Sequence, residues 1–209
     1  MKIVKLFIIG LSVVAMAACN IKPVETEKEM KYENETIETI MERRSIRKYK
    51  PEIVARETLE KIMECGINAP NGQNKQSWEV RVVDNPAVMD EIKAVMAEAY
   101  GDKAEMAVGC FRGAPVMVFI ARDLNYDFSA YDCGLLAENI MLSAQSLGVG
   151  SICLGSPVRI INDNEACAPI LERLGFSEGY EFCLCVGLGY ADEAPEAKPR
   201  DKSKVLFVE

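Results

Sequence analysis

The sequence contains no histidine in its 209 residues. A Ser-His-Asp triad, a histidine general base and a histidine-ligated zinc site are therefore excluded. The eight cysteines include no C-x-x-C pair, so neither a structural metal site nor a thioredoxin-type redox pair is expected. Chemistry must come from a cofactor, carboxylates, thiols, tyrosines or backbone groups.

Positive charge is also scarce, because 24 Lys and Arg face 32 Asp and Glu and the formal net charge is −8. An acidic body repels nucleic acid at long range, so nucleic-acid binding is not expected. Any anionic ligand would need a local basic pocket.

Residues 1–19 have the layout of an export signal. Lys2 and Lys5 make the start of the chain positive, and an apolar run from Leu6 to Ala15 follows. Small residues then precede Cys19. The run is too short for a membrane span. The cysteine after the small residues resembles the lipobox of bacterial lipoproteins, which implies a signal peptide at 1–18 and a lipid on Cys19. The alternative is a plain signal peptide with an incidental cysteine.

The segment after the signal is polar and has no apolar periodicity. We interpret residues 19–34 as a tether and 35–209 as the folded domain. The expected location is the bacterial cell envelope, where the lipid on Cys19 would be the chain's membrane contact. Asn20 takes the place of the aspartate that retains lipoproteins at the inner membrane, which favours the outer membrane.

Helix-like and strand-like patterns alternate along the domain, which predicts a layered α/β or α+β fold. Helices are predicted at 36–44, 57–68, 87–100, 129–147 and 164–174. Strands are predicted at 78–83, 114–121, 151–155 and 181–190, and the tail ends in the strand-like 205–208. The 129–147 helix is apolar on most faces, so we expect a dimer interface to cover part of it.

Seven cysteines lie in the domain, and on their spacing they are expected to be free thiols acting as small apolar residues. Cys183 and Cys185 form the only close pair, and two residues on one strand face cannot readily form a disulfide with each other.

Arg43, Arg44 and Arg47 cluster around Ser45 in an otherwise acidic protein. Guanidinium groups and a hydroxyl suit phosphate recognition, while the alternative is a solvated basic helix end. A second cationic spot, Lys198-Pro199-Arg200, is a weaker candidate because charge runs are usually solvated.

Two further segments are rich in groups that could contact a heteroaromatic ring. The loop at 70–76, PNGQNKQ, carries several amide side chains, although ordinary turn formation explains it equally well. Glycines at 148, 150 and 155 permit close backbone approach. They lack the third glycine of a dinucleotide-binding fingerprint, which disfavours a Rossmann-type site.

Four segments together resemble the nitroreductase family in order and spacing. They are MERRSIRKYKP, INAPNGQNKQSWEVRVV, AENIMLSAQSLGVGSICLGSP and VGLGYADEAPEAKPR, which span essentially the whole domain. The resemblance implies an α+β, three-layer fold with a central, mostly antiparallel sheet flanked by helices, in an intertwined homodimer. It also implies FMN as cofactor and NAD(P)H as electron donor.

The resemblance also assigns roles to residues. Arg43, Arg44, Ser45 and Arg47 would contact the FMN phosphate, ribityl chain and pyrimidine edge. Pro70, Asn71, Gly72 and Asn74 would line the isoalloxazine ring. Leu154 and Gly155 would lie by flavin N5, and Lys198 and Arg200 would hold the phosphate. Leu154 stands where many relatives have glutamate, which removes one possible cofactor contact.

The implied activity is hydride transfer from a reduced nicotinamide, through flavin N5, to a nitro-, quinone- or similar electron-accepting small molecule. No protein acid or base is strictly required, which agrees with the absence of histidine. Reduced nicotinamide is scarce outside the cytoplasm. A lipid-anchored flavin carrier or sensor without turnover therefore stays open, as does an envelope enzyme with another electron source.

Overall fold

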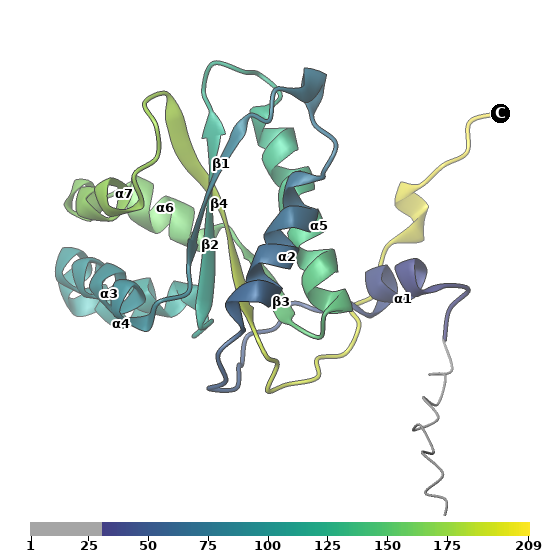
Figure 1. Ribbon diagram of the computed structural model, residues 1–209, viewed down its shortest axis with the longest axis horizontal. Helices are drawn as coiled ribbons and strands as arrows, with labels where there is room; N and C mark the ends of the chain where they lie inside the picture. Colours follow the sequence, from purple (N-terminus) through teal and green to yellow (C-terminus); the bar gives the residue numbers. More distant parts are fainter. Residues whose placement is uncertain (1–30) are drawn as a thin grey trace, which may run out of the picture.

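A computed structural model of the chain describes residues 31–209, so the predicted export signal and Cys19 lie outside the described residues. Its strands form one sheet in the order β1-β2-β4-β3, and every neighbouring pair is antiparallel (Figure 1). The strands are β1 (Trp78–Val83), β2 (Val116–Asp123), β3 (Gly150–Leu154) and β4 (Tyr180–Gly189). The prediction of an antiparallel α+β sheet is confirmed.

Helices cover both faces of the sheet, which gives the predicted three layers (Figure 1). On one face lie α2 (Arg56–Ile67) and α5 (Ser129–Ser146). On the other lie α3 (Pro86–Tyr100), α4 (Ala104–Val108), α6 (Ser156–Asn162) and α7 (Ala168–Leu174). The first helix, α1 (Glu35–Glu42), lies to the side and contacts α5.

The apolar strand β2 explains why the core has two halves. Successive side chains of a strand point to opposite faces, so Met117 and Phe119 pack under α3, α6 and α7. Val118 and Ile120 pack under α2 and α5. All four are fully buried, which accounts for the unbroken apolar run at 114–121.

Helix α5 buries one side and exposes apolar residues on the other. Leu136 and Ile140 are almost fully buried, whereas Tyr131 is 70% and Leu135 44% exposed. The sheet therefore accounts for only part of its apolar surface, as expected of a helix that a second copy also covers. Within residues 31–209, no helix is both long and apolar enough to cross a membrane.

The structure corrects the prediction in several places. The helix predicted at 164–174 is split into a 3-10 turn (Glu165–Cys167) and α7, and the short helices α4 and α6 were not predicted. Both α6 and α7 begin with a proline in the first turn, a favoured position that marks new helix starts. The predicted strand at 205–208 is wrong, because this exposed tail pairs with no strand among residues 31–209.

Candidate functional site

The segment 43–47 runs beside β3 at the edge of the sheet. Ser45 and Ser151 form a parallel bridge, and the Ile46 N–H donates to the Ser151 carbonyl at 2.9 Å. A Cβ on Gly150 would lie only 2.9 Å from the Ile46 side chain. Glycine at 150 therefore permits this close approach.

Arg43 differs from the other basic residues of this segment, because a buried nitrogen of its guanidinium has no hydrogen-bond partner. Its side chain is 21% exposed, and its Nε is buried without a hydrogen-bond partner. Glu138 of α5 lies 4.0 Å from that Nε and orients the guanidinium. Burial and the Glu138 carboxylate raise the pKa of the Cys153 thiol above its usual value, and the Arg43 guanidinium offsets part of this rise.

Arg44 has a different role from Arg43. Its Nη1 donates to the carbonyls of Met41 and Arg43, at 2.7 and 2.9 Å, where α1 ends. Carbonyls at a helix C-terminus lack intrahelical donors, and a cationic side chain satisfies them well. The helix-end interpretation therefore describes Arg44, and its contact with phosphate stays a prediction.

Glu193 holds the exposed residue Arg47 in place through the backbone. Its carboxylate accepts the backbone N–H groups of Arg47 and Lys48, the latter at 3.2 Å. Tyr49 and Ala191 form an antiparallel bridge in the same region. The chain after β4 thus fixes the backbone of 47–49, while the Arg47 guanidinium donates to the Ser45 carbonyl at 3.0 Å.

Two predicted ring-side residues end β3. Leu154 is buried, and Gly155 follows it in an exposed position. A Cβ built on Gly155 would meet no atom within 4 Å, so open space lies in front of this backbone. Ser45 bridges to Ser151, and Gly155 lies four residues farther along the chain, directly after β3, roughly 13 Å from Ser151 at the usual rise per residue.

The loop 70–76 is anchored elsewhere, at the start of α5. The Gly72 N–H donates to Asp132 Oδ1 at 3.0 Å, and the Ser77 hydroxyl donates to Asp132 Oδ2 at 2.6 Å. Asn71 closes the loop by accepting the Gln76 N–H at 2.9 Å. Pro70 and Asn74 are exposed on this loop.

One chain does not bring these two groups of residues together. The 70–76 loop leads into β1 at one edge of the sheet, and segment 43–47 borders β3 at the opposite edge. Four inter-strand spacings separate them, roughly 19 Å. Lys198 and Arg200 lie exposed on the tail, where Arg200 Nη1 donates to the Lys198 carbonyl. A site that uses all these residues needs more than one chain.

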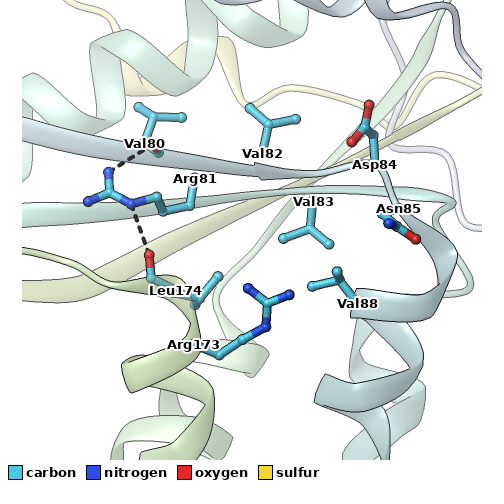
Figure 2. Close-up of a pocket in the computed structure, with 9 residues that line it drawn as sticks. All are labelled: Val80, Arg81, Val82, Val83, Asp84, Asn85, Val88, Arg173 and Leu174. Atoms are coloured by element: carbon cyan, nitrogen blue, oxygen red, sulfur yellow. Dashed lines mark hydrogen bonds between the residues drawn. The ribbon is translucent and has the colours of Figure 1, made fainter.

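Neither described cavity contains the predicted residues. Figure 2 shows a cavity of about 300 Å³ between β1, α3 and α7, where Arg81 donates to the Leu174 carbonyl at 2.9 Å. Arg81 also donates to the Gly175 carbonyl at 2.6 Å, so it caps α7. A larger cavity of about 610 Å³ lies between α4 and α6 and reaches Ser156, next to Gly155.

The domain thiols are all free in the structure. Burial raises the pKa of the Cys110 thiol to about 12, which keeps it protonated. Cys183 differs, because the neighbouring Cys133 thiol and then the Arg122 guanidinium lower its pKa. Among residues 31–209, no group of three or more acidic or thiol side chains could hold a metal ion.

Three acidic residues that shape the site were not predicted from the sequence. Asp132, Glu138 and Glu193 each contact one of the predicted segments. Asp132 could have been noticed as a carboxylate in the first turn of an otherwise apolar helix. Glu193 lies 146 residues from its partner Arg47, and no local pattern connects the two.

Residues 40–190 match the family model described as "Nitroreductase family". The chain belongs to the nitroreductase family. A solved nitroreductase with bound FMN from Desulfitobacterium hafniense is 36% identical, with a TM-score of 0.74 over 84% of this chain and 99% of that one. A Bacteroides fragilis nitroreductase with bound FMN is 27% identical, with a TM-score of 0.73 over 84% of this chain and all of that one.

Curated relatives agree with this membership. The NADPH-flavin oxidoreductase of Vibrio harveyi is 31% identical over 187 residues, which is 84% of this chain and 74% of that protein. A relative from Archaeoglobus fulgidus, described as a putative NADH dehydrogenase/NAD(P)H nitroreductase, is 31% identical over 75% of this chain and 85% of its own length. Homodimers are typical of the nitroreductase family, which suits a site divided between two edges of one chain.

Proposed function

We propose that this chain is an FMN-dependent oxidoreductase that transfers hydride from reduced nicotinamide, through the flavin, to a small electron acceptor. The observation that carries the proposal is the Arg43 guanidinium, sheltered beside β3 with an unpartnered Nε. The flavin-bound structures and NAD(P)H-dependent relatives of this family support the same cofactor and donor.

The residues at the edge of β3 fit FMN. Arg43 Nε, which has no hydrogen-bond partner, could donate to the phosphate, and the Ser151 hydroxyl is likewise buried without a hydrogen-bond partner. Gly155 presents its backbone to open space, where a flat ring could approach closely. FMN supplies the redox chemistry by accepting and releasing hydride at N5.

The protein would bind and orient this cofactor. Arg43 and Ser45 would hold the phosphate end, and the Gly155 N–H would donate toward N5. Arg47 would lie at the pyrimidine edge, where its positive charge stabilises negative charge on the reduced ring. Each role uses donors and fixed charge, so the absence of histidine is no obstacle.

A second copy of the chain would complete the site. The 70–76 loop lies too far from segment 43–47 to share one flavin within a chain, as the sheet order requires. In the proposed homodimer, this loop from one protomer would cover the flavin held at β3 of its partner. The exposed apolar side chains of Tyr131 and Leu135 on α5 provide surface for such an interface.

The acceptor we propose is a nitro-, quinone- or similarly electron-poor small molecule. We also propose that Cys19 carries a lipid that anchors the enzyme in the cell envelope. An enzyme in the envelope would need an electron donor at that location. Either reduced nicotinamide or a membrane-associated source could deliver electrons to the flavin.

The decisive experiment is an absorption spectrum of the purified full chain, followed by anaerobic titration with NADH and NADPH. We expect a flavin spectrum that bleaches with one of the two donors and recovers on addition of a quinone or nitroaromatic. A protein that neither copurifies with flavin nor binds added FMN would overturn the proposal. Bound flavin that neither donor reduces would instead identify a flavin carrier or sensor.

A further inference from the structure

Asp132 is a buried carboxylate whose two oxygens both hold the 70–76 region. The residue is 2% exposed and lies in the first turn of α5. One oxygen accepts the Gly72 backbone N–H, and the other accepts the hydroxyl of Ser77, which is 1% exposed. Burying a carboxylate is costly, and a buried carboxylate that receives these two donors ties the loop firmly to the helix.

The loop that Asp132 holds has an unusual backbone. Gln73, Asn74 and Gln76 have φ angles of 55°, 55° and 49°, in the left-handed region that favours glycine. Side chains with a Cβ adopt this region at an energetic cost, so such a cluster persists only where surrounding contacts enforce it. Hydrogen bonds at both ends of the loop, to Gly72 and Ser77, provide that enforcement.

We propose that Asp132 is a positioning residue, which holds the 70–76 loop in this strained shape so that the loop forms one wall of the flavin site. The inference rests on the proposed function for the ligand. The anchoring of the loop by Asp132 rests on the two hydrogen bonds alone and does not depend on the proposed function. Asp132 touches neither flavin nor substrate, and it acts through Gly72 and Ser77.

The loop carries its own reporter, since exposed Lys75 is a trypsin site in its middle. We would compare wild type, Asp132→Ala and Asp132→Asn for native-state cleavage after Lys75 without added FMN. Asparagine can accept from Gly72 and donate to Ser77, so it should restore the loop. Asp127→Ala is the matched control, because Asp127 is exposed and, within the described part of the chain, forms no hydrogen bond or ion pair.

We expect Asp132→Ala to be cleaved at Lys75 at least about tenfold faster than wild type, and Asp132→Asn and Asp127→Ala to resemble wild type. We also expect Asp132→Ala to weaken FMN binding roughly ten- to hundredfold and to shift the visible absorption bands of bound FMN. A general loss of stability would leave the bands of bound FMN unshifted, so this signature separates positioning from folding.

Unchanged cleavage at Lys75 in a folded Asp132→Ala protein would overturn the anchoring. Faster cleavage with unchanged FMN affinity and bands would overturn the flavin-wall role. If wild type bound no FMN, the proposed function would fail while the cleavage result still tested the anchor, so the two failures are distinguishable.

Discussion

The hydroxyl of Tyr126 occupies the space that a side chain at position 72 would need. A Cβ built on Gly72 would lie 2.1 Å from Tyr126 Oη and 3.0 Å from its Cζ. Tyr126 belongs to an aromatic cluster with Phe128, whose ring centroid lies 5.7 Å away in an edge-to-face arrangement. The ring therefore packs directly against the loop at Gly72.

We expect Gly72→Ala to displace the 70–76 loop, because neither the held Tyr126 ring nor the Asp132 anchor can yield easily. FMN affinity should fall by about tenfold or more, measured by quenching of flavin fluorescence. Gly72 has no left-handed φ, so the penalty is steric.

A double-mutant cycle tests that steric origin. Tyr126→Ala combined with Gly72→Ala should recover most of the lost affinity, since the new methyl group then has room. If the two losses simply added, the contact between the two residues would not be the cause.

Arg43 and Arg44 should behave differently although they are neighbours. Arg43→Ala should lower FMN occupancy of the purified protein by about tenfold or more, because it removes the sheltered free donor. Arg44→Ala should mainly lower the melting temperature, because its guanidinium caps α1. Flavin absorbance and calorimetry measure the two effects, and equal flavin loss in both variants would contradict the assignment.

Cys183 should be more reactive when Cys133 is present. The neighbouring Cys133 thiol lowers the pKa of Cys183, so a larger fraction of Cys183 is thiolate at a given pH. In Cys133→Ala, that pKa should rise, and alkylation of Cys183 by iodoacetamide near neutral pH should slow. Peptide mass spectrometry can follow it, with exposed Cys153 as internal reference. Unchanged labelling of Cys183 would contradict this coupling.

Much of the fold could be predicted because it depends on local patterns. Alternation and β-branching gave the bounds of β1 correctly, and an unbroken apolar run identified β2 as buried on both faces. The tail at 205–208 misled because its apolar residues resemble a strand, yet a strand needs a pairing partner, and the described part of the chain places none beside it.

The site was less predictable because its geometry depends on contacts across the chain. The pattern of basic residues identified segment 43–47. It could not distinguish Arg44, which caps a helix, from Arg43, whose Nε has no hydrogen-bond partner. That distinction depends on which carbonyls lie within reach after folding. The division of the predicted residues between opposite sheet edges likewise follows from strand order, which no single segment encodes.

The proposed envelope anchor can be tested by expressing the full chain in a bacterium that lipidates its envelope proteins. Cys19→Ser should leave an unlipidated protein that no longer fractionates with membranes, because the lipid is the proposed anchor. Fractionation followed by intact-mass measurement reports both effects. A plain signal peptide predicts instead that the Cys19→Ser protein fractionates as wild type does.

The strongest test of the divided site uses a surface that touches no predicted flavin residue. Leu135 is 44% exposed on α5, and a charge there should disfavour burial against a second copy. Leu135→Asp should therefore sediment as a monomer and bind FMN at least about tenfold more weakly, although each chain keeps every proposed contact residue.

Met106→Asp is the matched control, because Met106 is 57% exposed on α4, on the opposite face of the sheet. It should remain dimeric with wild-type affinity for FMN. A monomeric Leu135→Asp protein with undiminished affinity would mean that one chain holds the flavin alone. The 70–76 loop would then have no part in binding it, since the sheet keeps that loop at the edge opposite segment 43–47.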